Sequence, residues 1–191
     1  METEGKIVRL FIEEKNPKTI REISKKIKSD YRITHTATQR LLEKNILLSK
    51  IVGKSILCEL NTLYYGIEIY EAENKRKENL LENKNLKQLY KEIMTKARSV
   101  FFVFLVFGSH IKGKPTKSSD IDIMFISNDR DFEEKIMDVT SLLPIKLHVL
   151  VFTEEEFIRM KDSKKSNVIK EAIENNIILY GIENYYRLKN A

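Results

Sequence analysis

Two apolar segments joined by a short polar loop are the most constraining feature of this chain of 191 residues. The first, residues 100–107, ends abruptly in Gly108-Ser109, and the second opens with Asp120 and Asp122, separated by a single isoleucine. On a strand, residues two apart point to the same face, so the two carboxylates are expected to project together. Two carboxylates at so short a distance repel each other unless a cation lies between them, and Mg²⁺ prefers such hard oxygen ligands.

The residues after 99 predict an α+β domain in which helices flank a mixed sheet. Because residues 100–107 are all apolar, the first strand is expected to be buried on both faces. Thr153 and Glu156 have the spacing of a capping box and predict a helix start there. Further strands are expected at 120–127, 145–152 and 177–180, with helices at 129–143, from 153 on, and, as the last helix, at 167–175.

This arrangement resembles the polymerase-beta-like nucleotidyltransferase superfamily, and more closely the minimal nucleotidyltransferases of bacteria and archaea. Their signature is an apolar strand, Gly-Ser-x-x-x-Gly, a polar loop, and Ser-Asp-x-Asp. The matching positions here are Gly108, Ser109, Gly113, Ser119, Asp120 and Asp122. A Leu-Tyr-Gly ending at residues 179–181 extends the resemblance to about residue 183.

The resemblance implies attack of a hydroxyl on the α-phosphate of a nucleoside triphosphate, with pyrophosphate as the leaving group. Asp120 and Asp122 would be catalytic ligands shared by two Mg²⁺ ions. Gly108 and Ser109 would hold the β- and γ-phosphates, with Ser119 as a further nucleotide-binding candidate. The lysines of the polar loop, Lys112, Lys114 and Lys117, either contact phosphate or are merely solvated.

Active relatives carry a third carboxylate on the strand that follows, and here His148 occupies that position. Histidine is a general base near neutral pH but a poor substitute for a Mg²⁺-binding carboxylate. His148 therefore indicates either altered chemistry or a protein that binds nucleotide without turning it over. Asp129 and Glu154 flank the predicted sheet and are the other acids that a loop shift would bring to the position of the third carboxylate.

The first 62 residues predict three helices and a β-hairpin. Apolar spacing places the helices at 6–15, 19–27 and 34–45, and alternation places strands at 46–50 and 55–60. This order resembles a winged helix-turn-helix domain, whose third helix enters the major groove of DNA. The resemblance implies DNA-binding candidates on the third helix and the wing: Thr34, His35, Thr36, Thr38, Gln39, Arg40, Lys50, Lys54 and Ser55. Winged-helix domains also dock proteins.

Residues 63–98 predict a helical connector between domains 1–62 and 99–191. Its two apolar stripes, from Leu63 to Tyr70 and from Leu80 to Ile93, are expected to pack against the wing or to form a homodimer contact. Residues 1–60 hold 13 Lys and Arg against 8 Asp and Glu, whereas residues 99–191 hold 13 against 14. The positive charge therefore lies away from the Asp-x-Asp segment, which favours a polyanion partner for the N-terminal domain.

No apolar run approaches the roughly 18 residues needed to cross a membrane, and no membrane partner is expected. One cysteine, Cys58, excludes an intrachain disulfide and suits a reducing, cytoplasmic compartment.

Two functions from different classes remain open. One is a Mg²⁺-dependent nucleotidyltransferase that modifies a protein, an RNA or a small-molecule hydroxyl, with a toxin-type protein among the partners. The other is a catalytically weak DNA-binding regulator, or an antitoxin-like protein, that uses the nucleotidyltransferase domain for nucleotide sensing or partner binding.

Overall fold

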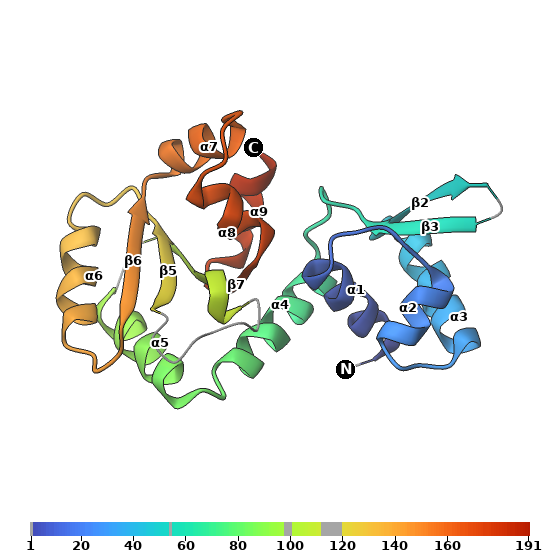
Figure 1. Cartoon of the computed structure of the whole chain (residues 1–191), viewed down its shortest axis with the longest axis horizontal. Coiled ribbons are helices and arrows are strands. Elements are labelled where there is room, and N and C mark those ends of the chain that lie inside the picture. Colours follow the sequence, from blue (N-terminus) through green and yellow to red (C-terminus); the bar gives the residue numbers. More distant parts are fainter. Residues whose placement is uncertain (1, 54, 98–100, 112–119) are drawn as a thin grey trace. The chain divides into compact units, whose positions relative to one another are not determined.

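A computed structural model describes residues 2–53, 55–97, 101–111 and 120–191. The chain divides into two compact units, Met1–Asn74 and Lys75–Ala191. The division falls inside helix α4 (Ile67–Leu80) and not at the boundaries expected at residues 62 and 98. Each unit is described by itself below, and Figure 1 gives the labels of the elements.

The N-terminal unit combines helices with a small antiparallel sheet. Its elements are α1 (Thr3–Glu13), β1 (Lys18–Thr19), α2 (Ile20–Lys26), α3 (Tyr31–Glu43), β2 (Leu47–Val52) and β3 (Ser55–Leu60), followed by the start of α4. The strand order is β1-β3-β2, so β2 is an edge strand. Ile7, Phe11, Ile23 and Leu41 fill the core between the helices.

Local side-chain bonds fix where two of these helices begin. Thr19 and Glu22 form a capping box at the start of α2. Helix α3 begins three residues earlier than expected, because the Asp30 carboxylate accepts hydrogen bonds from the backbone N–H groups of Arg32 and Ile33. The polar turn predicted at residues 28–32 is therefore shorter than the sequence suggested.

The C-terminal unit is a mixed sheet flanked by helices, as the sequence predicts. After α4 its elements are α5 (Lys84–Lys96), β4 (Val103–Phe107), the 3-10 turn η1 (Gly108–His110), β5 (Ile121–Ile126), α6 (Phe132–Ser141), β6 (Leu147–Phe152), α7 (Glu154–Asp162), α8 (Val168–Glu174), β7 (Asn176–Tyr180) and α9 (Ile182–Asn190). The strand order is β6-β5-β4-β7, with β5 and β6 parallel and the other two pairs antiparallel.

The two faces of this sheet are covered by different helices. Helices α5 and α6 pack on the face formed by residues such as Phe104 and Ile123, whereas α8 and α9 contact β4. Every residue of β4 is buried, which confirms the expected burial for residues 103–107, whereas Phe101, which was expected to belong to the same buried strand, precedes β4 and is 87% exposed. The capping box of Thr153 and Glu156 at the start of α7 is also confirmed.

Two expectations about helices in this unit are wrong. The apolar stripe of α5, with Leu86, Leu89 and Ile93, lies in the core of the C-terminal unit, so it is not available to the hairpin or to a second copy. Residues 167–175 are not the last helix, because α9 follows β7 and buries Tyr185, Tyr186 and Leu188. Among the residues that the structure describes, no helix is both long and apolar enough to cross a membrane.

Candidate functional site

Asp122 lies at the meeting point of three strands in the C-terminal sheet. It is the second residue of β5 and pairs with Phe107, the last residue of β4, and with His148 on β6. Because side chains alternate along a strand, Asp122 projects from the face opposite to Ile121 and Ile123, which are buried. Its side chain is 26% exposed, so the carboxylate is partly shielded but open to a ligand.

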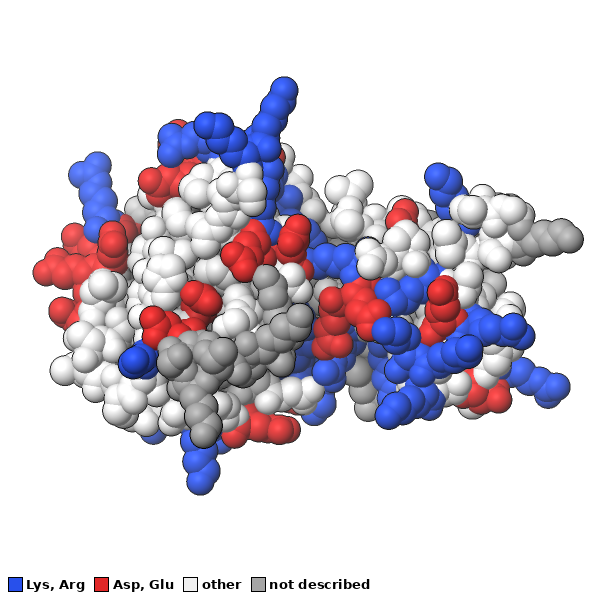
Figure 2. Space-filling view, in the orientation of Figure 1, with Lys and Arg blue, Asp and Glu red and all other residues white. Residues whose placement is uncertain are grey.

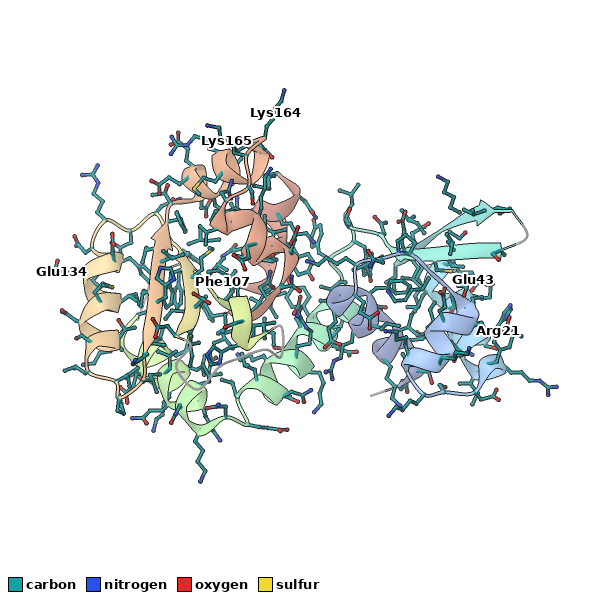
Figure 3. The ribbon with its side chains drawn as sticks, in the orientation of Figure 1. Arg21, Glu43, Phe107, Glu134, Lys164 and Lys165 are labelled. Atoms are coloured by element: carbon teal, nitrogen blue, oxygen red, sulfur yellow. The ribbon has the colours of Figure 1, made fainter. Side chains whose placement is uncertain are left out.

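The Gly108-Ser109 turn lies directly against this carboxylate. Gly108 follows Phe107, which Figure 3 labels within the C-terminal unit, and has a left-handed backbone with φ +77°. A Cβ at Gly108 would lie 2.1 Å from Oδ2 of Asp122, so only glycine leaves room for the carboxylate. Residues 108–110 form the three-residue 3-10 turn η1.

His148 is the nearest side-chain partner of Asp122 that the structure describes. Its Nδ1 lies 3.0 Å from Oδ1 of Asp122, and its side chain is 56% exposed. The cross-strand register of β5 and β6 therefore places this histidine directly beside Asp122. A hydrogen bond from Nδ1–H to the carboxylate leaves Nε2 as the basic nitrogen of the ring.

The two other acids considered for this position follow the opposite ends of strands β5 and β6. Asp129 follows the end of β5 and Glu154 follows the end of β6, whereas Asp122 and His148 are the second residues of these strands. At about 3.3 Å per residue, the four further strand residues alone separate the groups by more than about 10 Å. Neither acid supplies a third ligand beside Asp122.

Both of these acids are engaged elsewhere. Asp129 accepts a hydrogen bond from the Asp131 N–H and pairs with Lys135, and these contacts hold its carboxyl pKa below the ordinary value. Both carboxylate oxygens of Glu154 lie 3.0 Å from the guanidinium of Arg187. Each acid therefore stabilises the end of a strand or helix.

Asp120 is exposed and directly precedes β5, whose first N–H, that of Ile121, donates to the Lys146 carbonyl. The alternation that carries Asp122 out of the sheet extends to Asp120. No group of three or more His, Cys, Asp and Glu side chains with metal-binding geometry occurs among the described residues. The described geometry therefore joins one carboxylate, that of Asp122, to His148, while Asp120 lies two residues before Asp122 along the chain. Carboxylate oxygens are the ligands that a hard cation prefers.

Five of the predicted binding residues cannot be placed in this geometry. They lie outside the described residues and are the phosphate- and nucleotide-binding candidates Lys112, Lys114, Lys117 and Ser119, and Lys54 on the predicted wing. Ser109 is described and is partly exposed in the turn next to Gly108.

The third helix of the N-terminal unit corrects part of the predicted DNA-binding set. Thr34 and Thr38 are fully buried, although they were expected to be exposed. Their hydroxyls donate to the Asp30 and Thr34 carbonyls, and both side chains lie on the same face of α3 as the buried Ala37 and Leu41. His35, Thr36 and Arg40 are exposed, and Gln39 is partly exposed.

The hairpin and α3 of this unit carry both charged and apolar surface. Lys50 and Ser55 are exposed on the hairpin, and so are Ile51 and Ile56, which pair across the strands. Figure 2 shows Lys and Arg side chains gathered over the N-terminal unit with acidic side chains between them. One of these acids, Glu4, lies 3.5 Å from Arg40 and 3.6 Å from Lys44.

Strand order, the Gly-Ser turn and the carboxylate at the start of β5 together define a nucleotidyltransferase-type domain. The profile of the family "Polymerase beta, Nucleotidyltransferase" matches residues 84–185, more than half of the chain. The chain therefore belongs to the polymerase beta nucleotidyltransferase family, whose activity is nucleotidyl transfer. The match begins at the first residue of α5, which agrees with the place of that helix in the core of the C-terminal unit. Neither the curated proteins nor the solved structures contain a significant match.

Proposed function

We propose that this protein binds a nucleoside triphosphate with Mg²⁺ and transfers its nucleoside monophosphate to a hydroxyl group. The observation that carries the proposal is the contact between Gly108 and Asp122. At this contact, the glycine turn, which would bind a phosphate, lies directly against the Asp122 carboxylate, which would attract a cation. Backbone N–H groups at a tight glycine turn bind phosphate oxygens, and a neighbouring carboxylate can share a cation with the same phosphates.

The side chains at this edge divide the work of the reaction. Gly108 and Ser109 would bind the β- and γ-phosphates, so that the α-phosphate lies over Asp122. When bound through Asp120 and Asp122, Mg²⁺ would supply neutralisation of the charge on the phosphates. His148, oriented by its bond to Asp122, would accept the proton of the attacking hydroxyl at Nε2. The α-phosphate would then be bonded to the acceptor oxygen, and pyrophosphate would leave.

A labelling experiment tests this transfer. The purified protein is incubated with each of the four triphosphates labelled at the α-phosphate, with Mg²⁺ and a nucleotide-free cell extract, and the label is followed into protein, RNA and small molecules. Incorporation by the wild type that disappears in Asp122→Asn, which keeps the size of the side chain, supports the proposal. Absence of label from all three fractions contradicts it.

A second candidate function is nucleotide sensing without turnover. The register that pairs His148 with Asp122 favours it, because a histidine replaces an acid where the related enzymes bind the catalytic metal. A sensor would bind the triphosphate and leave it intact. Recovery of unchanged triphosphate after long incubation with saturating protein separates this function from transfer.

We propose that the N-terminal unit is a winged helix-turn-helix domain that binds DNA. Three helices followed by a hairpin, an exposed Arg40 and Thr36 on α3, and an exposed Lys50 on the hairpin support the proposal. Fluorescence anisotropy of a labelled duplex tests it. Binding that weakens with salt and is reduced in Arg40→Ala and Lys50→Ala supports a DNA partner. Absence of DNA binding at low salt contradicts a DNA partner and favours a protein partner, such as a toxin-type protein.

A further inference from the structure

A buried polar cluster lies behind the phosphate-binding turn, on the edge strand of the C-terminal sheet. Its members are Arg76 on α4, Asn176 at the start of β7, and Tyr185 on α9, with exposed fractions of 6%, 7% and 3%. Asn176 is the cross-strand partner of Phe107, and Phe107 directly precedes Gly108. The cluster is therefore one strand away from the turn that touches Asp122.

Specific hydrogen bonds hold Asn176 in this cluster. A guanidinium nitrogen of Arg76 donates to the Asn176 backbone carbonyl, and the side-chain amide of Asn176 donates to the Tyr185 hydroxyl over 2.6 Å. The same amide donates to the Ala172 carbonyl over 2.6 Å. Burying an arginine and an amide costs free energy unless both are bonded, and here the bonds converge on one residue.

The position of Asn176 in the sheet explains why the hydrogen bonds to this residue affect the Gly108-Ser109 turn. Strand β7 is at the edge of the sheet, where carbonyls that point outward have no strand to bond them. Arg76 supplies the missing donor at the first residue of β7, opposite the last residue of β4. The end of β4 is thus fixed from one side by Asp122 on β5 and from the other by the anchored start of β7.

We infer that Arg76 is a positioning residue for nucleotide binding: it holds the start of β7 against Phe107 and thereby sets the place of the Gly108-Ser109 turn relative to Asp122. The identity of the ligand in this inference rests on the proposed function, whereas the contacts of Arg76 and Asn176 do not depend on it. Nothing in the sequence motif predicted it, because Arg76 lies 32 residues before Gly108 in a charged stretch that reads as a solvated helix face.

The test compares Arg76→Met and Arg76→Lys with Lys75→Met, an exposed neighbour on the same helix. Without ligand, the amide chemical shifts of Gly108 and Ser109 in ¹⁵N-labelled protein should change in Arg76→Met and remain near wild type in Lys75→Met. With Mg²⁺ and the triphosphate that the wild type binds, Arg76→Met should weaken binding about tenfold, because the displaced turn no longer holds the phosphates in place. Arg76→Lys, which keeps a cationic donor, should recover part of that loss.

Tyr185→Phe provides a milder variant in case Arg76→Met does not fold, because it removes only the hydroxyl that accepts from Asn176. It should move the same two amide signals in a folded protein. Unchanged Gly108 and Ser109 shifts in the folded variants overturn the inference, even if thermal stability falls. Failure of the wild type to bind any triphosphate, with the amide shifts moved as expected, overturns the proposed function and leaves the positioning role supported.

Discussion

Nδ1 of His148 lies 3.0 Å from Oδ1 of Asp122. The two residues are each the second residue of their strand, and these strands, β6 and β5, are parallel neighbours. This pair gives the site its particular chemistry, because one partner is the candidate metal ligand and the other is an imidazole in contact with it. A carboxylate oxygen engaged by histidine is less available to a cation, so the pair links metal binding to the orientation of the ring.

Replacing the histidine by an acid should therefore increase the response to Mg²⁺. In His148→Asp the new carboxylate faces Asp122, and the two repel each other without a cation. We expect a lower melting temperature than wild type in the absence of metal and a larger rise on addition of Mg²⁺, corresponding to about 1–3 kcal/mol of linkage stabilisation. Differential scanning calorimetry with and without Mg²⁺ measures both.

His35→Asp is the matched control, because it makes the same chemical change at an exposed position of the N-terminal unit. It should leave the Mg²⁺ response of the protein unchanged. An equal response to Mg²⁺ in wild type and His148→Asp would contradict the assignment of this edge as a cation site.

Gly108→Ala should disable nucleotide binding through Asp122. The new methyl group would meet Oδ2 of Asp122 at 2.1 Å and displace the carboxylate. We expect Mg²⁺-triphosphate affinity to fall roughly tenfold or more, a change above about 1.4 kcal/mol. A left-handed alanine also costs about 1–2 kcal/mol of folding stability.

Gly53→Ala separates these two effects. Gly53 has a similar left-handed backbone, with φ +60°, but a Cβ there meets nothing within 4 Å. Gly53→Ala should lose folding stability only because alanine is strained in a left-handed backbone conformation, and it should retain wild-type nucleotide affinity. Chemical denaturation measures the stability and titration calorimetry measures the affinity. Comparable affinities in the two variants would show that the contact with Asp122 does not matter.

Glu4→Gln should strengthen DNA binding by the N-terminal unit. Glu4 lies 3.5 Å from Arg40 and 3.6 Å from Lys44, so its charge opposes the attraction of these side chains to phosphate. We expect an affinity increase of about threefold at low salt that fades as salt screens the charges. Glu13→Gln, which removes the same charge from a pair with Arg9, should give a smaller increase in the same anisotropy assay.

Cys58 should react slowly in the folded protein. Burial raises the pKa of its thiol, and the thiolate is the reactive form. Because the folded pKa exceeds the unfolded one, the thiol's contribution to stability is present below about pH 8.5 and is lost as pH rises further. Alkylation by iodoacetamide at pH 8.5, followed by mass spectrometry, should be at least about tenfold faster in urea. Equal rates would place Cys58 at the surface.

The sequence predicted the local features of the site because these depend on neighbours in the chain. An apolar run ending in glycine, and aspartates alternating with isoleucines, determine strand ends and facing directions without long-range information. The capping box at Thr153 is local in the same sense.

Features that depend on tertiary contacts were not predicted. Thr34 and Thr38 are polar residues on a helix, and only the packing of α3 shows that their hydroxyls bond its own backbone inside the core. Helix α5 reads as a connector until the sheet that buries it is known. Arg76 and Asn176 are 100 residues apart, and no sequence pattern joins them.

Isothermal titration of the purified protein with ATP, GTP, CTP and UTP, with and without Mg²⁺, decides whether a nucleotide binds at Asp120 and Asp122. We expect that at least one triphosphate binds only with Mg²⁺, and that binding is lost in the double variant Asp120→Ala/Asp122→Ala. Binding that needs no Mg²⁺ and survives the loss of both aspartates, or no binding of any triphosphate, would contradict a nucleotide site at this edge of the sheet.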